Sequence, residues 1–79
     1  MTKDQLRTIG RALYGTHWQT QIANAITNLN GDALDVRRVQ QWACGARPVP
    51  DWLLQELKKL AAKRLAELKE LNIYLIGLN

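Results

Sequence analysis

Three polar side chains with the chemistry to read DNA bases lie at helical spacing in the middle of the chain. At about 100° per residue, Arg37, Gln40 and Gln41 share one face of a helix. The apolar Val39 and Trp42 fall on the opposite face. Arginine pairs bidentately with guanine, and glutamine pairs with adenine. The pattern therefore predicts a short helix with a buried apolar face and an exposed face that can contact base edges.

The chain offers little for catalysis or for metal binding. Its one cysteine, Cys44, has no second cysteine with which to form an internal disulfide, and its one histidine, His17, has no partner at the spacing of a metal site. The carboxylates are scattered, and no nucleophile is paired with a base. We therefore expect no enzymatic activity and no cofactor, and we expect Cys44 to be an unreactive thiol.

The composition is that of one small globular domain that favours a polyanionic partner. The chain has 79 residues, of which 47% are hydrophobic and 23% are charged, and its formal net charge is +4. The positive excess lies in residues 1–50, which suits nucleic acid. The only sustained apolar run, residues 73–78, is far shorter than the ~20 residues of a membrane-spanning helix. The N-terminus lacks the layout of a secretion signal, so we expect a cytoplasmic protein.

Two Thr-x-x-Gln sequences predict the starts of the first two helices. They occupy residues 2–5 and 16–19, and each precedes an apolar stripe at helical spacing, which is typical of a capping box. We expect one helix over residues 3–14 and a second helix from about His17. Residues 28–35 contain Asn-Gly-Asp and are expected to form a loop.

Two more helices are expected on either side of a proline-containing link. Asp35 can cap a helix of about ten residues, and Gly45 can end it in the left-handed conformation. Pro50 suits the first turn of a long helix, rich in Leu, Ala, Lys and Glu, that reaches about Leu71. Residues 72–79 fit either a frayed helix end or a short strand.

The expected fold class is all-α, with four helices in a helix-turn-helix domain and a long fourth helix. We also expect a short C-terminal strand or helix extension. Residues 1–50 are assigned to the helix-turn-helix core, and residues 51–79 to the long helix and tail of the same domain. In this layout the second helix of the motif enters the DNA major groove.

A longer motif supports this layout. It comprises Leu13-Tyr14-Gly15, Trp18-Gln19, Ile22-Ala23 and Ile26, then Val39, Trp42, Gly45 and Arg47-Pro48-Val49-Pro50. The motif resembles the lambda-repressor-like helix-turn-helix proteins of the Cro and repressor type, especially small phage or prophage regulators, over residues 6–60. The resemblance implies a sequence-specific transcriptional regulator that binds a near-palindromic operator in double-stranded DNA, associated with the bacterial nucleoid. Relative to the compact family version, residues 27–34 hold an insertion of about six residues, a length that loop-closure entropy tolerates.

The resemblance also implies roles for particular side chains. Val36, Arg37 and Gln41 take base-reading positions, and Gln40 lies beside them. Gln19 matches a glutamine that anchors the DNA backbone at a helix N-terminus, where the dipole favours a phosphate. The residues expected to bind phosphates are Gln19, Thr20, Arg38 and Arg47.

Two of these features have less specific interpretations. Tryptophans at helix-packing spacing are usually core residues, so Trp18, Trp42 and Trp52 are predicted to be buried rather than to stack on bases. An Arg-Gln-Gln face on a short helix is usually a solvated surface, and the surrounding motif is what favours DNA reading here.

The C-terminal region has more apolar positions than a small core requires. They are Leu57, Leu60, Ala61, Leu65, Leu68, Leu71 and Leu75. We therefore expect a homodimer formed mainly through residues 60–79. The residues assigned to dimerisation are Leu65, Leu68, Leu71, Ile73 and Leu75. The alternative function is a helical protein-interaction module, antitoxin-like or adaptor-like, that binds a partner through this helix.

Overall fold

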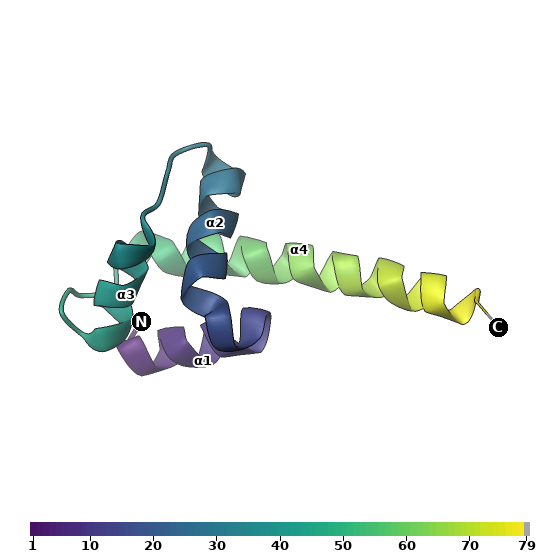
Figure 1. Cartoon of the computed structure of the whole chain (residues 1–79), viewed down its shortest axis with the longest axis horizontal. Coiled ribbons are helices and arrows are strands. Elements are labelled where there is room, and N and C mark those ends of the chain that lie inside the picture. Colours follow the sequence, from purple (N-terminus) through teal and green to yellow (C-terminus); the bar gives the residue numbers. More distant parts are fainter. Residues whose placement is uncertain (79) are drawn as a thin grey trace.

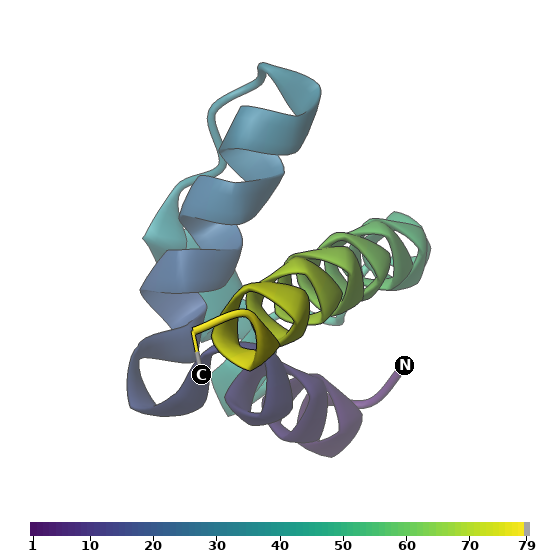
Figure 2. The same cartoon turned by 90° about the vertical axis from the view of Figure 1, so that its right-hand side faces the viewer.

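The computed structural model describes residues 1–78, which form the predicted all-α fold and contain no strand (Figure 1). The elements are α1 (Lys3–Tyr14), the short 3₁₀ helix η1 (Gly15–His17), α2 (Trp18–Asn30), α3 (Val36–Cys44) and α4 (Asp51–Ile76). α1, α2, α3 and the start of α4 pack together at one end, and the rest of α4 extends away from them (Figure 1). Figure 2 looks along α4 from its C-terminal end, with α2 standing to one side of it. The molecule is accordingly elongated, measuring 50 × 26 × 19 Å.

The predicted first helix is confirmed at both ends, whereas the second capping box is not formed. The Thr2 hydroxyl accepts from the Gln5 N–H at 3.1 Å, and the Gln5 side-chain carbonyl accepts from the Thr2 N–H at 2.9 Å. Gly15 ends α1 at a φ of 74°. α2 begins at Trp18, and no side chain caps it. Thr16 lies within η1, so its hydroxyl comes too early in the chain to cap α2.

α2 is longer, and the following loop shorter, than predicted. The helix continues through Asn30, which leaves only residues 31–35 between α2 and α3. Thr27 ties this loop to the helix, because its hydroxyl donates to the Ala23 carbonyl at 2.8 Å and accepts from the Leu34 N–H at 2.9 Å. Much of the inserted length therefore forms the last turn of α2 and is not part of the loop.

α4 runs past its predicted end. Residues 72–76 belong to the helix, so the strand alternative is wrong for them, and Asn79 lies outside the described residues. No Gly or Pro occurs between Asp51 and Gly77 to interrupt the run of helix-forming residues. None of the helices in residues 1–78 combines enough length with enough apolar character to cross a lipid bilayer.

The core forms where α1, α2, α3 and the first turns of α4 meet. Its buried apolar side chains are Leu6, Trp18, Ile22, Ala23, Ile26, Val39, Trp42, Ala43, Leu53, Leu57 and Leu60. Leu57 and Leu60 therefore belong to the core of one chain, so the expectation that they are surplus apolar positions is wrong. The prediction that Trp52 is buried is also wrong, since 46% of this residue is exposed. It meets the buried Trp42 edge-on, with ring centroids 5.7 Å apart, because the neighbouring Leu53 occupies the inward position.

α1 and α2 pack closely together at Gly10. Gly10 is buried in the middle of α1, and a Cβ atom there would lie 2.2 Å from Cε3 and 2.5 Å from Cδ2 of Trp18. Only glycine lets the indole lie directly against the α1 backbone. This contact sets how closely the two helices approach.

Gly10→Ala is expected to destabilise the fold by about 1–3 kcal/mol, because the added methyl overlaps the indole and overpacks a filled core. The effect opposes the ordinary helix preference for alanine, which would be worth about 1 kcal/mol in the other direction. The free energy of urea unfolding measures the change. Gly77→Ala is the matched control, since its Cβ would come no nearer than 3.5 Å to a carbonyl oxygen. Equal stability of the Gly10 variant and the natural chain would contradict this account of the helix contact.

Candidate nucleic-acid interface

α3 is held at both ends by hydrogen bonds and by a glycine. An Asp35 carboxylate oxygen accepts from the Arg37 N–H at 2.9 Å, which confirms the predicted N-cap. Gly45 ends the helix at a φ of 84°, also as predicted. The chain then turns back, and the Arg47 N–H donates to the Gln41 carbonyl at 3.2 Å. The helix and its following link are therefore fixed relative to each other.

α3 buries one face and exposes the other. Val39, Trp42 and Ala43 are buried in the core, whereas Arg37 and Gln40 are exposed. This split agrees with the predicted helical periodicity. The polar face is thus presented to solvent by a rigid, well-packed helix.

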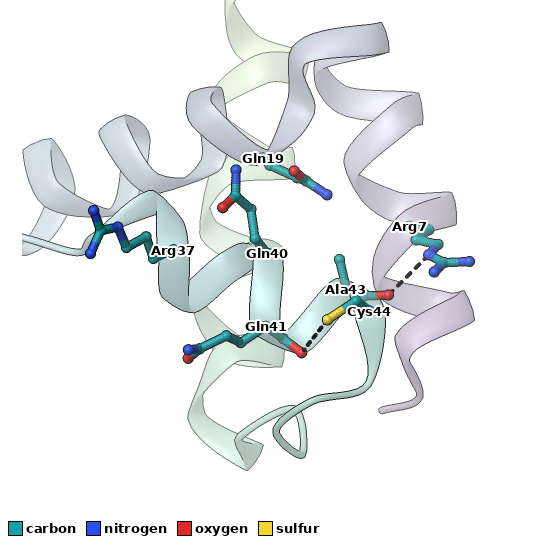
Figure 3. A pocket seen from close by; sticks show the side chains of 7 residues that line it. All are labelled: Arg7, Gln19, Arg37, Gln40, Gln41, Ala43 and Cys44. Atoms are coloured by element: carbon teal, nitrogen blue, oxygen red, sulfur yellow. Dashed lines mark hydrogen bonds between the residues drawn. The ribbon is translucent and has the colours of Figure 1, made fainter.

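Two of the predicted base-reading residues are less accessible. Gln41 is half-buried, and its amide projects away from Gln40 and Gln19 (Figure 3). Val36 is also half-buried and packs against the core cluster. The base-reading role expected of Val36 stays a prediction, because its side chain packs partly against the core. Only part of its side chain remains open to a thymine methyl group.

The polar face of α3 lines an open hollow together with residues of α1 and α2 (Figure 3). The lining residues are Arg7, Gln19, Arg37, Gln40, Gln41, Ala43 and Cys44. Gln40 points toward Gln19, whereas Arg37 and Gln41 project to the other side of α3 (Figure 3). No α4 residue lines this hollow. The structure thus brings together the predicted reading residues and the predicted anchor at the start of α2.

The other predicted phosphate-binding residues do not join that hollow. Arg38 and Arg47 are exposed on the opposite flank of α3, where they line a shallow surface with Trp42 and Trp52. Thr20 is exposed on α2 but lines neither surface. Polar and basic groups therefore flank the exposed face of α3 on both sides.

A row of basic residues on α1 was missed from the sequence. The Arg7 Nε donates to the Ala43 carbonyl at 3.0 Å and so joins α1 to the end of α3. Arg11 lines a neighbouring hollow with Gln19, and Lys3 lies beside the end of α3. The signal was present in the four-residue spacing of these three side chains, which places them on one side of a helix.

The acidic and titratable groups nearby do not neutralise this surface. Arg7 lies 3.8 Å from the Asp4 carboxylate, but the Arg7 side chain is 43% exposed and that of Asp4 79% exposed, so their attraction is weak in water. Burial raises the pKa of the Tyr14 phenol, which lies near Arg64 and Glu67, and neither of these residues lines the hollow. Residues 1–78 contain no group of three or more side chains placed to hold a metal ion.

Comparisons with protein-family models, with curated proteins and with solved structures found no match to this chain. The resemblance to the lambda-repressor-like proteins therefore stays a prediction that rests on its motif residues.

Asp35→Ala is expected to cost about 1 kcal/mol of stability, because the first turn of α3 loses the side-chain acceptor for its N–H groups. Thermal unfolding followed by circular dichroism measures the loss. Asp32→Ala is the control, since this exposed loop residue lies outside the helices. A similar loss in both variants would mean that general charge, and not the cap, is responsible.

Proposed function

We propose that this chain is a sequence-specific DNA-binding transcriptional regulator that places the exposed face of α3 in the major groove. The observation that carries the proposal is the joint placement of Arg37, Gln40 and Gln41 on a helix whose opposite face is core. These side chains have the donors and acceptors that distinguish guanine and adenine edges. The rigid packing of α3 means that they are presented without a large loss of backbone entropy on binding.

The surroundings of α3 suit the sugar-phosphate backbone on both sides of the groove. Gln19 at the start of α2 and Arg7 on α1 stand on one flank, and Arg38 and Arg47 stand on the other. The major groove is about 12 Å wide and is bordered by phosphates of both strands. Phosphate contacts on the two flanks would orient the helix, while the central side chains select the sequence.

One copy of α3 is short for this task. The helix has nine residues, and only a few of its side chains can reach base edges. The proposal therefore includes a second copy of the chain bound to the other half of a near-palindromic operator. A Cro-type or repressor-type regulator of this kind acts in the bacterial cytoplasm, at the nucleoid.

A protein-interaction module is the second candidate function, and one observation favours it. The C-terminal part of α4 exposes several large apolar side chains, among them Leu65, Ile73 and Tyr74. Such a surface suits a protein partner but gives no reason for an exposed Arg-Gln-Gln face on α3. A salt titration of binding to random and selected duplexes separates the candidates, because only a DNA reader has both a steep salt slope and a large specificity ratio.

Arg37→Ala and Gln41→Ala are each expected to weaken binding to the preferred duplex by about 1–3 kcal/mol and to leave nonspecific binding nearly unchanged, because base contacts are lost. Fluorescence anisotropy with a selected and a scrambled duplex measures both affinities. Lys69→Ala is the control, an exposed cation on the distant part of α4. Equal losses on the two duplexes would refute base reading by Arg37 and Gln41.

Arg47→Ala is expected to weaken binding to every duplex alike and to lower the slope of log affinity against log salt by about one unit, because one phosphate contact is lost. The same anisotropy assay at several salt concentrations measures the slope. A loss confined to the selected duplex would show that Arg47 reads sequence and does not serve as a phosphate contact.

A further inference from the structure

The last part of α4 buries no side chain against the domain, and only Lys63, Arg64 and Glu67 line a hollow together with residues of α1 and α2. Leu53, Leu57 and Leu60 are buried, but every residue from 61 to 78 is exposed. We call residues 61–78 the arm. Figure 1 shows the arm extending past α1 and α2.

The arm carries a large uncovered apolar surface. Its exposed apolar side chains and their exposed fractions are Leu65 55%, Leu68 49%, Leu71 49%, Ile73 71%, Tyr74 65%, Leu75 54%, Ile76 65% and Leu78 62%. Most helical stability in proteins comes from packing of an apolar face. Contiguous exposed apolar side chains of this kind mark an interaction surface.

One face of the arm has the repeat of a helix-pairing seam. Ala61, Leu65, Leu68, Asn72 and Leu75 follow one another in alternating steps of four and three residues. This is the heptad spacing that keeps one stripe facing a second helix. We call these five residues the seam.

We propose that the arm pairs antiparallel with the arm of a second copy of this chain, with Leu65 opposite Leu68 of the second copy. The arm holds Lys63, Arg64 and Lys69 against Glu67 and Glu70. This near balance of charge permits self-association. None of the five seam residues is charged, and the register places Leu75 opposite the side chain of Lys58 of the second copy.

Charge disfavours the parallel arrangement. If Leu65 and Leu68 occupy the core positions a and d of the heptad, Arg64 and Lys69 occupy the flanking g and e positions. In a parallel pair, each g side chain meets the e side chain five residues later on the other helix. Arg64 would thus face Lys69 of the second copy, and the like charges would repel. In the antiparallel pair, Arg64 lies near Leu71 of the second copy, and Asn72 meets the short Ala61 of the second copy.

The tip of the arm also favours the antiparallel direction. Ile73 and Tyr74 point away from the seam, so the tip is apolar all round the helix, which is the pattern of a buried helix. A parallel pair would leave both side chains in water at its free end. The antiparallel pair sets the tip beside the domain of the second copy.

The domain offers an apolar hollow in the right place. Met1, Ile9 and Leu54 line it together with polar residues of α1. Leu54 is 38% exposed and lies eleven residues before Leu65. Eleven residues make about three helical turns, so Leu54 and Leu65 lie on almost the same side of α4. The tip of one arm therefore reaches the hollow beside Leu54 of the other copy.

The pairing also fits the DNA-binding proposal, although it does not depend on it. The seam and the core face of α4, marked by Leu53 and Leu57, are roughly a quarter turn apart at 3.6 residues per turn. In an antiparallel pair, the twofold axis is perpendicular to both helices and to the line that joins them through the seam. It therefore runs in the direction that the core face of α4 points, and both domains lie on the same side of the helix pair. From a rise of about 1.5 Å per residue, the two domains would sit about 30–45 Å apart. That interval includes the 34–36 Å between successive half-sites on DNA.

Cysteine crosslinking tests the pairing and its direction without DNA. The natural thiol, Cys44, is exposed and is first replaced in a full-length Cys44→Ser background. A mixture of the Ala61→Cys and Asn72→Cys chains is expected to form the mixed disulfide under mild oxidation, identified by mass. Asn72→Cys alone is expected to give little dimer, because its two thiols would lie about 16 Å apart along the axis. A dominant Asn72→Cys self-dimer would establish parallel pairing and overturn the proposal.

Seam variants test whether the arm holds the dimer. Leu68→Asp is expected to raise the dissociation constant of the dimer more than about tenfold, because it buries a charge in the seam of each copy. Ala66→Asp, on the opposite side of the arm, is expected to change it little. Both positions are exposed in the single chain, so neither change disturbs the core. Sedimentation equilibrium measures the constants.

Three results would overturn the pairing. They are a full-length chain that stays monomeric at about 50 µM, an unchanged Leu68→Asp dimer, and equal losses in the two aspartate variants. Arg37→Ala separates this proposal from the DNA-binding one, because it is expected to leave association unchanged. A chain that dimerises but does not bind DNA would refute the proposed function and leave the pairing unaffected.

Discussion

The contact between Gly10 and Trp18 is the constraint on which the rest of the domain depends. The indole lies where a side chain on α1 would otherwise stand, so α1 and α2 pack closely at the start of α2. Gln19 follows Trp18 directly and is thereby held on the surface beside α1. Arg7, about one turn before Gly10 on α1, donates to the α3 carbonyl at Ala43. One missing methyl group thus sets the relation among the three helices around the hollow.

The backbone of α3 is held in place by contacts within the domain, so its polar face is formed without a ligand. Its apolar face is buried, its first turn is capped by Asp35, and its last turn is closed by Gly45 and by the hydrogen bond from Arg47 to Gln41. These local contacts leave the exposed side chains free while the backbone is held. A surface preorganised in this way loses less entropy when it binds. The longer connection before α3 does not undo this order, since Thr27 ties it to α2.

α4 is one continuous helix that contributes both to the buried core and to the exposed arm. Its first ten residues complete the core through Leu53, Leu57 and Leu60, and the remainder buries no side chain in the domain. Because the helix has no internal Gly or Pro, the position of the arm is set directly by the packing of the core. A change in core packing would therefore be transmitted to the arm as a change in its direction.

Local features of this protein were determined by the sequence itself. The cap at Thr2, the cap at Asp35, the stop at Gly45 and the two faces of α3 were all predictable, because each depends on residues within one or two turns. Only the tertiary structure decided that Arg7 joins α3, through a contact between residues 36 positions apart, and that Trp52 stays exposed. Those outcomes depend on which side chains compete for the interior once the helices meet, and helical periodicity carries no information about that competition.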